Sequence, residues 1–170
     1  MADALYEIPL AQFINKPPVS EEVVSRYYED RAPEWLVSLR TAIAGSAARE
    51  SLPSAVPGYL LFRVADRLET IVVIHEASGE IAAAVTHWDF HVWPGHRGRG
   101  LGVDILDQAF REGIKTLENT RYHALSRAGL GCRRAVHRRQ VERAVAEGVE
   151  VSAEVLEDYP ELRPAPITMP

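Results

Sequence analysis

A glycine-rich run with two arginines is the part of this sequence whose residue types point most directly to chemistry. The run consists of Arg97, Gly98, Arg99, Gly100, Leu101 and Gly102, and is called the glycine loop below. Glycines remove the side chains that would keep a phosphate away from the backbone, so consecutive N–H groups can point at one anion. The arginines add charge and fork-shaped donors, and the N-terminus of a following helix adds positive potential. The glycine loop therefore predicts a cradle for a diphosphate.

Two other phosphate-binding motifs do not fit this stretch. A dinucleotide-binding fingerprint has the spacing G-x-G-x-x-G and parallel strands joined by helices, whereas three strand-like runs arrive here without helices between them. A P-loop has a lysine followed by serine or threonine, which the glycine loop lacks. The remaining alternative is a glycine turn that only joins a strand to a helix.

A second candidate site is the alternating stretch T-H-W-D-F-H-V, in which His87, Asp89 and His91 hold every second position. A regular strand places alternate residues on one face. On that face an imidazole could accept a proton near neutral pH, with Asp89 orienting either histidine. The solvated face of a half-buried strand explains the same pattern. Two histidines and a carboxylate also suit Fe(II), although the two ends of the triplet lie about 13 Å apart along a straight strand.

The glycine loop and its flanks resemble motif A of the GNAT acyltransferase superfamily. The stretch reads V-W-P-G-H-R-G-R-G-L-G and runs into an amphipathic helix. The family pattern Q/R-x-x-G-x-G/A falls on Arg97, Gly100 and Gly102, and Val92 and Pro94 match common neighbours. The resemblance implies a coenzyme A thioester, usually acetyl-CoA, bound at the glycine loop. It also implies transfer of the acyl group to an amine.

The same resemblance implies roles for the strand before the loop. Backbone groups near Phe90, His91 and Val92 would pair with the pantetheine arm, where the central strands of the family splay apart. The general base of the family often lies on this strand, which makes His87 the first candidate, with Asp89 and His91 assisting.

The general acid is harder to assign. In the family it is often a tyrosine on the helix after the fifth strand, and none is present there. His137 lies in about that region and Tyr122 precedes it, or water would serve. Cys132 is expected to be a small core residue and not a nucleophile.

Positive charge is concentrated between residues 121 and 143 of a chain whose formal net charge is -5. The residues considered for contact with an anion are Arg127, Arg133, Arg134, Arg138 and Arg139. They would pair with the acidic ends of the chain, contact the 3'-phosphate of coenzyme A, or bind nucleic acid. Aromatic residues are sparse there, so stacking on single strands is not favoured.

A weaker resemblance concerns the ending E-G-V-E-V-S-A-E-V-L-E-D-Y-P-E-L, which is similar to a segment recurring in proteins of phages and plasmids. Phage DNA-modification enzymes of the Mom type are also similar to GNAT acyltransferases. Such a relative, with iron at His87, Asp89 and His91, is the alternative function. A non-catalytic GNAT-fold binding protein is a third, which the intact glycines disfavour.

The elements that must position these residues follow from hydrophobic periodicity. Strands are expected at residues 59–65, 70–75 and 81–92, and an amphipathic helix from Gly102 with Asp104, Asp107 and Arg111 facing water. The other expected elements are a short strand at 5–10, two helices or one kinked helix at 20–45, a loop at 45–58, a short strand at 122–125, and helices at 133–147 and 152–159.

These elements predict an α/β (α+β) fold of GNAT type, with a mixed, mostly antiparallel central sheet flanked by helices. The expected C-terminal end is atypical, because no pair of strands follows the helix that ends at Gly148. A single domain is expected over residues 1–160, with a loose proline-rich tail at 161–170. One cysteine and no apolar leader favour a cytoplasmic protein without a membrane segment.

Overall fold

The structure is a computed structural model that describes residues 4–14, 20–45, 49–64, 70–86, 90–114 and 126–163. Its strands are β1 (Arg49–Leu52), β2 (Tyr59–Val64), β3 (Thr70–His75), β4 (Ile81–Val85) and β5 (Phe90–Val92). Its α-helices are α1 (Leu10–Phe13), α2 (Glu21–Gly45), α3 (Leu101–Arg111), α4 (Arg127–Ala146) and α5 (Ala153–Glu157). Short 3-10 turns lie at Leu5–Glu7, Pro94–His96 and Pro160–Leu162. No helix in these described ranges is long and apolar enough to span a membrane.

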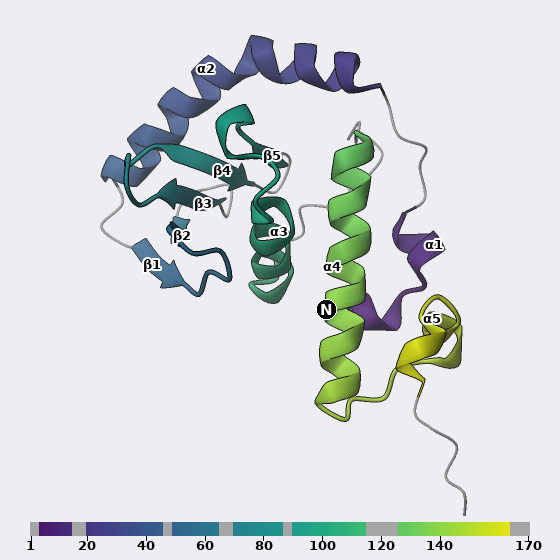
Figure 1. The fold of residues 1–170 in the computed structure, drawn as a ribbon. Coiled ribbons are helices and arrows are strands. Elements are labelled where there is room, and N and C mark those ends of the chain that lie inside the picture. Colours follow the sequence, from purple (N-terminus) through teal and green to yellow (C-terminus); the bar gives the residue numbers. More distant parts are fainter. Residues whose placement is uncertain are drawn as a thin grey trace, which may run out of the picture.

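The sheet has the strand order β1-β2-β3-β4-β5, and each strand runs antiparallel to its neighbour (Figure 1). The predicted meander is therefore confirmed, as is a mixed α and β fold. Two layers of helix cover the sheet. Alternate residues of β3 enter two different cores, with Ile71 and Val73 packing with α3 and Val72 packing with Leu39 of α2. Both faces of the sheet are buried because each faces a helix.

The predicted strand over residues 81–92 is wrong. It is two strands, β4 and β5, that pair antiparallel with Val85 opposite Phe90 and Ala83 opposite Val92. The chain reverses between them, and His87 and Asp89 fall in this interval, outside the described residues. The alternation of polar and apolar residues continues through the reversal, so periodicity alone did not mark it. Among the described strands β5 is an edge strand, so the expected splay between central strands is not observed.

Near the N-terminus two further predictions are corrected and one open alternative is decided. The predicted strand at 5–10 is a 3-10 turn followed by α1, which begins after Pro9. Of the two alternatives for residues 20–45, two helices or one kinked helix, the structure has a single helix, α2. The predicted loop at 45–58 contains β1, whose sequence R-E-S-L carries little strand signal of its own. Pairing with β2, in which Leu52 lies opposite Leu61, makes this segment a strand.

Helix α4 packs beside α3 and beside the N-terminal segment (Figure 1). The predicted helix at 133–147 is confirmed and begins earlier, at Arg127, with Ser126 accepting a hydrogen bond from the N–H of Gly129. It ends before Gly148, whose φ of 72° is one that residues with side chains rarely adopt. The short helix predicted at 152–159 is α5. The strand predicted at 122–125 and residues 164–170 of the tail lie outside the described residues.

Candidate anion-binding site

The glycine loop joins the end of β5 to the start of α3. Gly98 has φ 74° and Gly100 has φ 84°, both in the left-handed region that favours glycine. Gly100 directly precedes the first residue of the helix. Two of the glycines are therefore required by the path of the backbone, which turns sharply into the helix.

The loop leaves a run of backbone donors available. The N–H groups of residues 98–102 donate no hydrogen bond to any described residue, whereas those of Val103 and Asp104 donate to the carbonyl of Gly100 at 3.2 and 3.1 Å. Free N–H groups at a helix N-terminus, together with the helix dipole, form a site for an anion. The loop geometry therefore fits the predicted cradle for a diphosphate.

The two arginines of the loop differ in their settings. The Nε of Arg97 donates to the carbonyl oxygen of Val92 at 2.9 Å, so this side chain folds back and closes the turn that precedes the loop. Arg99 is exposed and makes no ion pair within the described ranges. Arg99 is therefore the better placed of the two to approach an incoming anion.

Gly102, the third glycine of the predicted pattern, lies in the core. A Cβ atom at this position would be 2.7 Å from Sγ of Cys132 and 3.3 Å from Cζ of Phe90. Phe90 and Val92 direct their side chains into the same core as α3. Burial raises the pKa of the Cys132 thiol, which agrees with its predicted place as a core residue. Gly102 thus allows close approach of α3 to α4 and β5.

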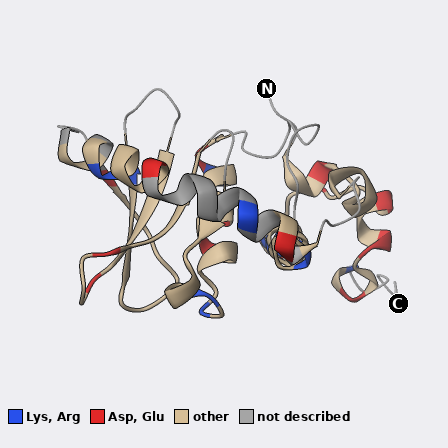
Figure 2. Cartoon of the chain, turned by 90° about the horizontal axis from the view of Figure 1, so that it is seen from above, with Lys and Arg blue, Asp and Glu red and all other residues tan. Residues whose placement is uncertain are grey.

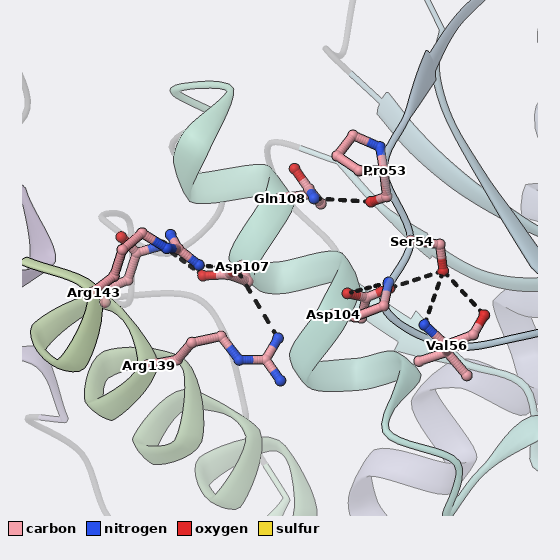
Figure 3. A network of polar contacts seen from close by, with 10 residues as sticks. Pro53, Ser54, Val56, Asp104, Asp107, Gln108, Arg139 and Arg143 are labelled. Carbon is pink, nitrogen blue, oxygen red and sulfur yellow. Dashed lines mark hydrogen bonds and ion pairs between the residues drawn. The ribbon is translucent and has the colours of Figure 1, made fainter. Parts of the chain in front are cut away.

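The first turn of α3 is hydrogen-bonded to the connection between β1 and β2 (Figure 3). The carboxylate of Asp104 accepts hydrogen bonds from Oγ of Ser54 at 3.1 Å and from the N–H of Ala55 at 3.2 Å. Val56 of the same connection would be 3.9 Å from a Cβ atom on Gly100. Residues 54–56 of this connection therefore lie directly beside the glycine loop.

The expectation that Asp104 and Asp107 face water is wrong, because both are almost fully buried. Asp107 accepts from Nε2 of Gln140 at 2.6 Å and pairs with Arg143 at 2.7 Å, and Arg139 lies 4.0 Å away (Figure 3). Partners on other elements stabilise both carboxylates in the interior. Arg111 is exposed, as predicted.

His91 does not lie on an open catalytic face. It is 8% exposed and packs beneath α2 between Trp35 and Trp93, with ring centroids 6.4 and 5.0 Å away. Burial, and then the charge of Arg97, lower the pKa of His91 to about 4. The break between β4 and β5 means that His87, Asp89 and His91 do not belong to one continuous strand, contrary to the prediction. The roles of His87 and Asp89 stay predictions.

No group of three or more potential metal ligands occurs among the described residues. His87 and Asp89 belong to the interval between β4 and β5 that the structure does not describe. The iron alternative therefore rests on the sequence pattern alone.

The suggestion that His137 serves as a general acid is wrong, because the residue is fully buried. Its Nδ1 lies 2.8 Å from the hydroxyl of Tyr159, and its Nε2 lies 2.7 Å from the carbonyl oxygen of Ile8. A carbonyl can only accept, so Nε2 donates to Ile8. Burial lowers the pKa of His137. Both ring nitrogens are used to join three segments of the chain. Tyr122 lies outside the described residues.

Most arginines of the predicted basic helix interact with other residues of the same chain. Arg133 is buried with its guanidinium 5.2 Å from the ring centroid of Phe13, and burial lowers its pKa to about 10. Arg138 pairs with Glu142 and with Glu161. Figure 2 shows several acidic residues around the C-terminal end. Arg139 lies near Asp107, as described above. Pairing with the acidic ends of the chain, one of the three alternatives, is therefore confirmed for Arg138.

Two of the exposed arginines of α4 have no acidic partner in the part of the chain that the structure describes. Arg127 and Arg134 lie two helical turns apart and make no ion pair with the described residues. Any contact of α4 with an outside anion would therefore begin with these two side chains.

A polar cluster that the sequence did not predict lies beside the glycine loop. It consists of Tyr59, His75, Ser78, Glu80 and His96, and is called the histidine cluster below. The hydroxyl of Tyr59 lies 3.1 Å from Nδ1 of His96, and Nδ1 of His75 lies 2.9 Å from Oγ of Ser78. Ser78 in turn donates to Glu80 at 3.1 Å.

The register of β2 and β3 explains why these residues meet. Tyr59 lies directly opposite His75, and Ser78 and Glu80 follow in the turn that leads to β4. His96 arrives from the turn before the glycine loop. The only signal available in the sequence was the place of His96 next to the R-G-R-G-L-G run.

Comparisons of this chain with protein-family models, with curated proteins and with solved structures found no match.

Proposed function

We propose that this chain is an acyl-CoA-dependent N-acyltransferase that binds the diphosphate of a coenzyme A thioester, such as acetyl-CoA, at the glycine loop. The observation that carries the proposal is the run of backbone N–H groups at residues 98–102 that donate to no described residue. A diphosphate is a compact, strongly charged acceptor, and N–H groups without an acceptor at a helix N-terminus are suited to bind such an anion.

The surroundings of the loop support a preformed site. Asp104 fixes the first turn of α3 to Ser54 and Ala55, and Gly102 lets the helix lie against β5. A donor set that is already oriented costs little ordering when its ligand binds. The coenzyme would supply the activated acyl group, so the protein has to position an amine and accept its proton.

The proton acceptor belongs to the proposal as well. His87 remains our first candidate, with Asp89 assisting, because both follow β4 directly and precede the strand that leads into the loop. His91 is less suitable, because it is buried and its pKa of about 4 makes the neutral imidazole a weak base. The acceptor amine stays unnamed.

Calorimetric titration with acetyl-CoA tests the cofactor assignment. We expect the wild type to bind and Gly100→Glu to lose binding, since the new carboxylate would enter the loop. Gly113→Glu is a matched control, because Gly113 also has positive φ, at 70°, and lies at the opposite end of α3 with open space around it. We expect it to bind as the wild type does. No binding to the wild type, or undiminished binding by Gly100→Glu, would contradict the assignment.

A further inference from the structure

The N-terminal segment, residues 5–13, is held against α4 by contacts that converge on His137. Nε2 of this fully buried imidazole lies 2.7 Å from the carbonyl oxygen of Ile8, and the ring of Phe13 stacks on it with centroids 5.6 Å apart. The other ring nitrogen, Nδ1, lies 2.8 Å from the hydroxyl of Tyr159. One imidazole thus joins the N-terminal segment to the segment that follows α4.

These contacts fix where each proton of the neutral ring lies. The carbonyl of Ile8 can only accept, so Nε2 carries the proton. Nδ1 then has a lone pair and accepts a hydrogen bond from the hydroxyl of Tyr159. Burial raises the pKa of Tyr159 to about 12, so this hydroxyl keeps its proton at neutral and acidic pH. The neutral imidazole therefore has one partner for each of its nitrogens.

A second proton on His137 is incompatible with this pairing. Protonated Nδ1 can no longer accept from the Tyr159 hydroxyl, and that buried hydroxyl makes no other hydrogen bond with the described residues. Protonation therefore leaves a buried donor without an acceptor and places a charge in the interior. Both costs disappear when the segments on either side of the ring move away and water reaches it.

The groups that carry charge near His137 belong to the three segments that meet there, and one of them favours the protonated ring. They are Tyr6, Glu7, Arg133, Arg138, Asp158, Tyr159 and Glu161. The charge of Asp158 raises the pKa of His137, but its carboxylate also accepts from the N–H of Leu10 at 2.9 Å. Burial has the larger effect and lowers the pKa of His137 overall. Protonation is therefore disfavoured while the segments are closed.

We propose that His137 makes closure of the N-terminal segment onto α4 sensitive to acid. The neutral ring holds residues 5–13 and 153–159 in place, and protonation opens the two segments together while the sheet stays folded. An imidazole exposed by opening titrates near pH 6.5, whereas the buried ring takes up its proton only at lower pH. The closed state is thus favoured fully above about pH 6.5 and less as the pH falls. This inference is independent of the proposed function.

Hydrogen exchange at several pH values, corrected for the intrinsic exchange rates, measures the opening equilibrium of each segment. Opening is accompanied by uptake of one proton, so the opening constant of residues 5–13 and 153–159 should rise by up to tenfold for each pH unit below about 6.5. The range from about pH 6.5 to about pH 5 is suitable, because it lies above the ordinary pKa values of carboxyl groups. The strands β2, β3 and β4 should stay protected over this range.

Two variants separate opening at His137 from a general loss of stability in acid. His137→Gln removes the titration and keeps one donor and one acceptor for Ile8 and Tyr159, so its opening constant should not change with pH. His91→Phe is the matched control, because it removes a second buried histidine of lowered pKa that lies in the other core. We expect it to keep the pH dependence at residues 5–13. Dependence that persists in His137→Gln, or that is lost in His91→Phe, would overturn the inference.

The ¹⁵N chemical shifts of the His137 ring give a second test that uses the wild type alone. We expect the proton on Nε2 at pH 7, and we expect the ring to gain its second proton over the same pH range in which residues 5–13 open. A proton on Nδ1 at pH 7 would contradict the pairing with Ile8. Protonation without opening, or opening of only one of the two segments, would overturn the inference as well.

Discussion

Gly102 is restricted by its neighbours and not by its backbone conformation. It lies inside the first turn of α3, and Sγ of Cys132 and the ring of Phe90 fill the space where a side chain would begin. The spacing R-x-x-G-x-G from Arg97 to Gly102 thus meets two physical requirements. Gly100 is needed for the left-handed turn, whereas Gly102 is needed for close packing.

We expect Gly102→Ala to lower the free energy of unfolding by about 1–3 kcal/mol, because it overpacks a filled core. Urea unfolding would measure this loss. Gly95→Ala is the control, since nothing lies within 4 Å of the added Cβ. Adding Cys132→Ala to Gly102→Ala should recover part of the loss by removing the nearest atom. A double variant no more stable than expected from the two single changes would contradict the packing explanation.

His91 should make stability depend on pH. Its pKa is about 4 in the folded protein and 6.5 for an unperturbed imidazole, so the unfolded chain takes up the proton first as the pH falls. The contribution of His91 to the free energy of unfolding is therefore most favourable above about pH 6.5, and it is lost as the pH falls towards 4. The loss amounts to at most about 3 kcal/mol.

The variant His91→Phe removes this titration while keeping an aromatic ring between Trp35 and Trp93. Urea unfolding followed by tryptophan fluorescence at several pH values would show a flatter dependence for the variant. His137, whose pKa is also lowered by burial, accounts for a remaining slope. Equal slopes for variant and wild type between pH 4 and 6.5, the two pKa values of His91, would show that this side chain does not contribute.

At the scale of elements, the sequence predicted those whose signal is local. The β-branched run of β3 and the long helix α4 have strong patterns of their own, and both were found. The glycine loop was recognisable for the same reason, since a glycine at positive φ is a local requirement. The reversal between β4 and β5 and the strand β1 depend on pairing with other strands, which periodicity does not encode.

Side chains whose partners are distant in sequence were the ones misassigned. Asp104 is paired with Ser54, fifty positions away, and Asp107 with Arg143, thirty-six positions away. A charged residue on a helix is expected to be exposed to water unless a buried partner from another part of the chain is known. The histidine cluster was missed for a related reason, because the strand register that places Tyr59 opposite His75 had to be known first.

Asp107 should be the main polar connection between α3 and α4. We expect Asp107→Ala to cost about 3–5 kcal/mol of unfolding free energy, because it leaves Arg143 and Gln140 without their acceptor in a largely buried setting. Glu142→Ala removes an exposed ion pair with Arg138 on the same helix and should change stability little. Chemical denaturation of the two variants compares them. If both variants lost a similar amount of unfolding free energy, burial of Asp107 would not explain its contribution to stability.

At the scale of the whole molecule, α4 joins the two ends of the chain. Phe13 stacks on His137 with ring centroids 5.6 Å apart, and Ile8 and Tyr159 each bond to that imidazole. Leu5 and Phe13 belong to the same core as α3 and the sheet. The N-terminal segment is thus an integral part of the fold.

We expect His137→Ala to lower the free energy of unfolding by about 3 kcal/mol, through a cavity and two lost hydrogen bonds. Hydrogen exchange should then speed up together in residues 5–13 and 153–159, while the sheet stays protected. Tyr159→Phe loses one hydrogen bond and should cost about 1–2 kcal/mol. Faster exchange in only one of the two segments would show that His137 does not couple them.

The meeting of both ends at His137 has a consequence for synthesis. Residues 5–13 are synthesised before the sheet, yet α4 and Tyr159, which cover them, are synthesised after it. The contacts of this segment with α4 therefore cannot form until α4 has been made. The sheet can form earlier, because its strands follow one another along the chain and pair with their nearest neighbours. Closure of the N-terminal segment onto α4 is thus expected to follow formation of the sheet.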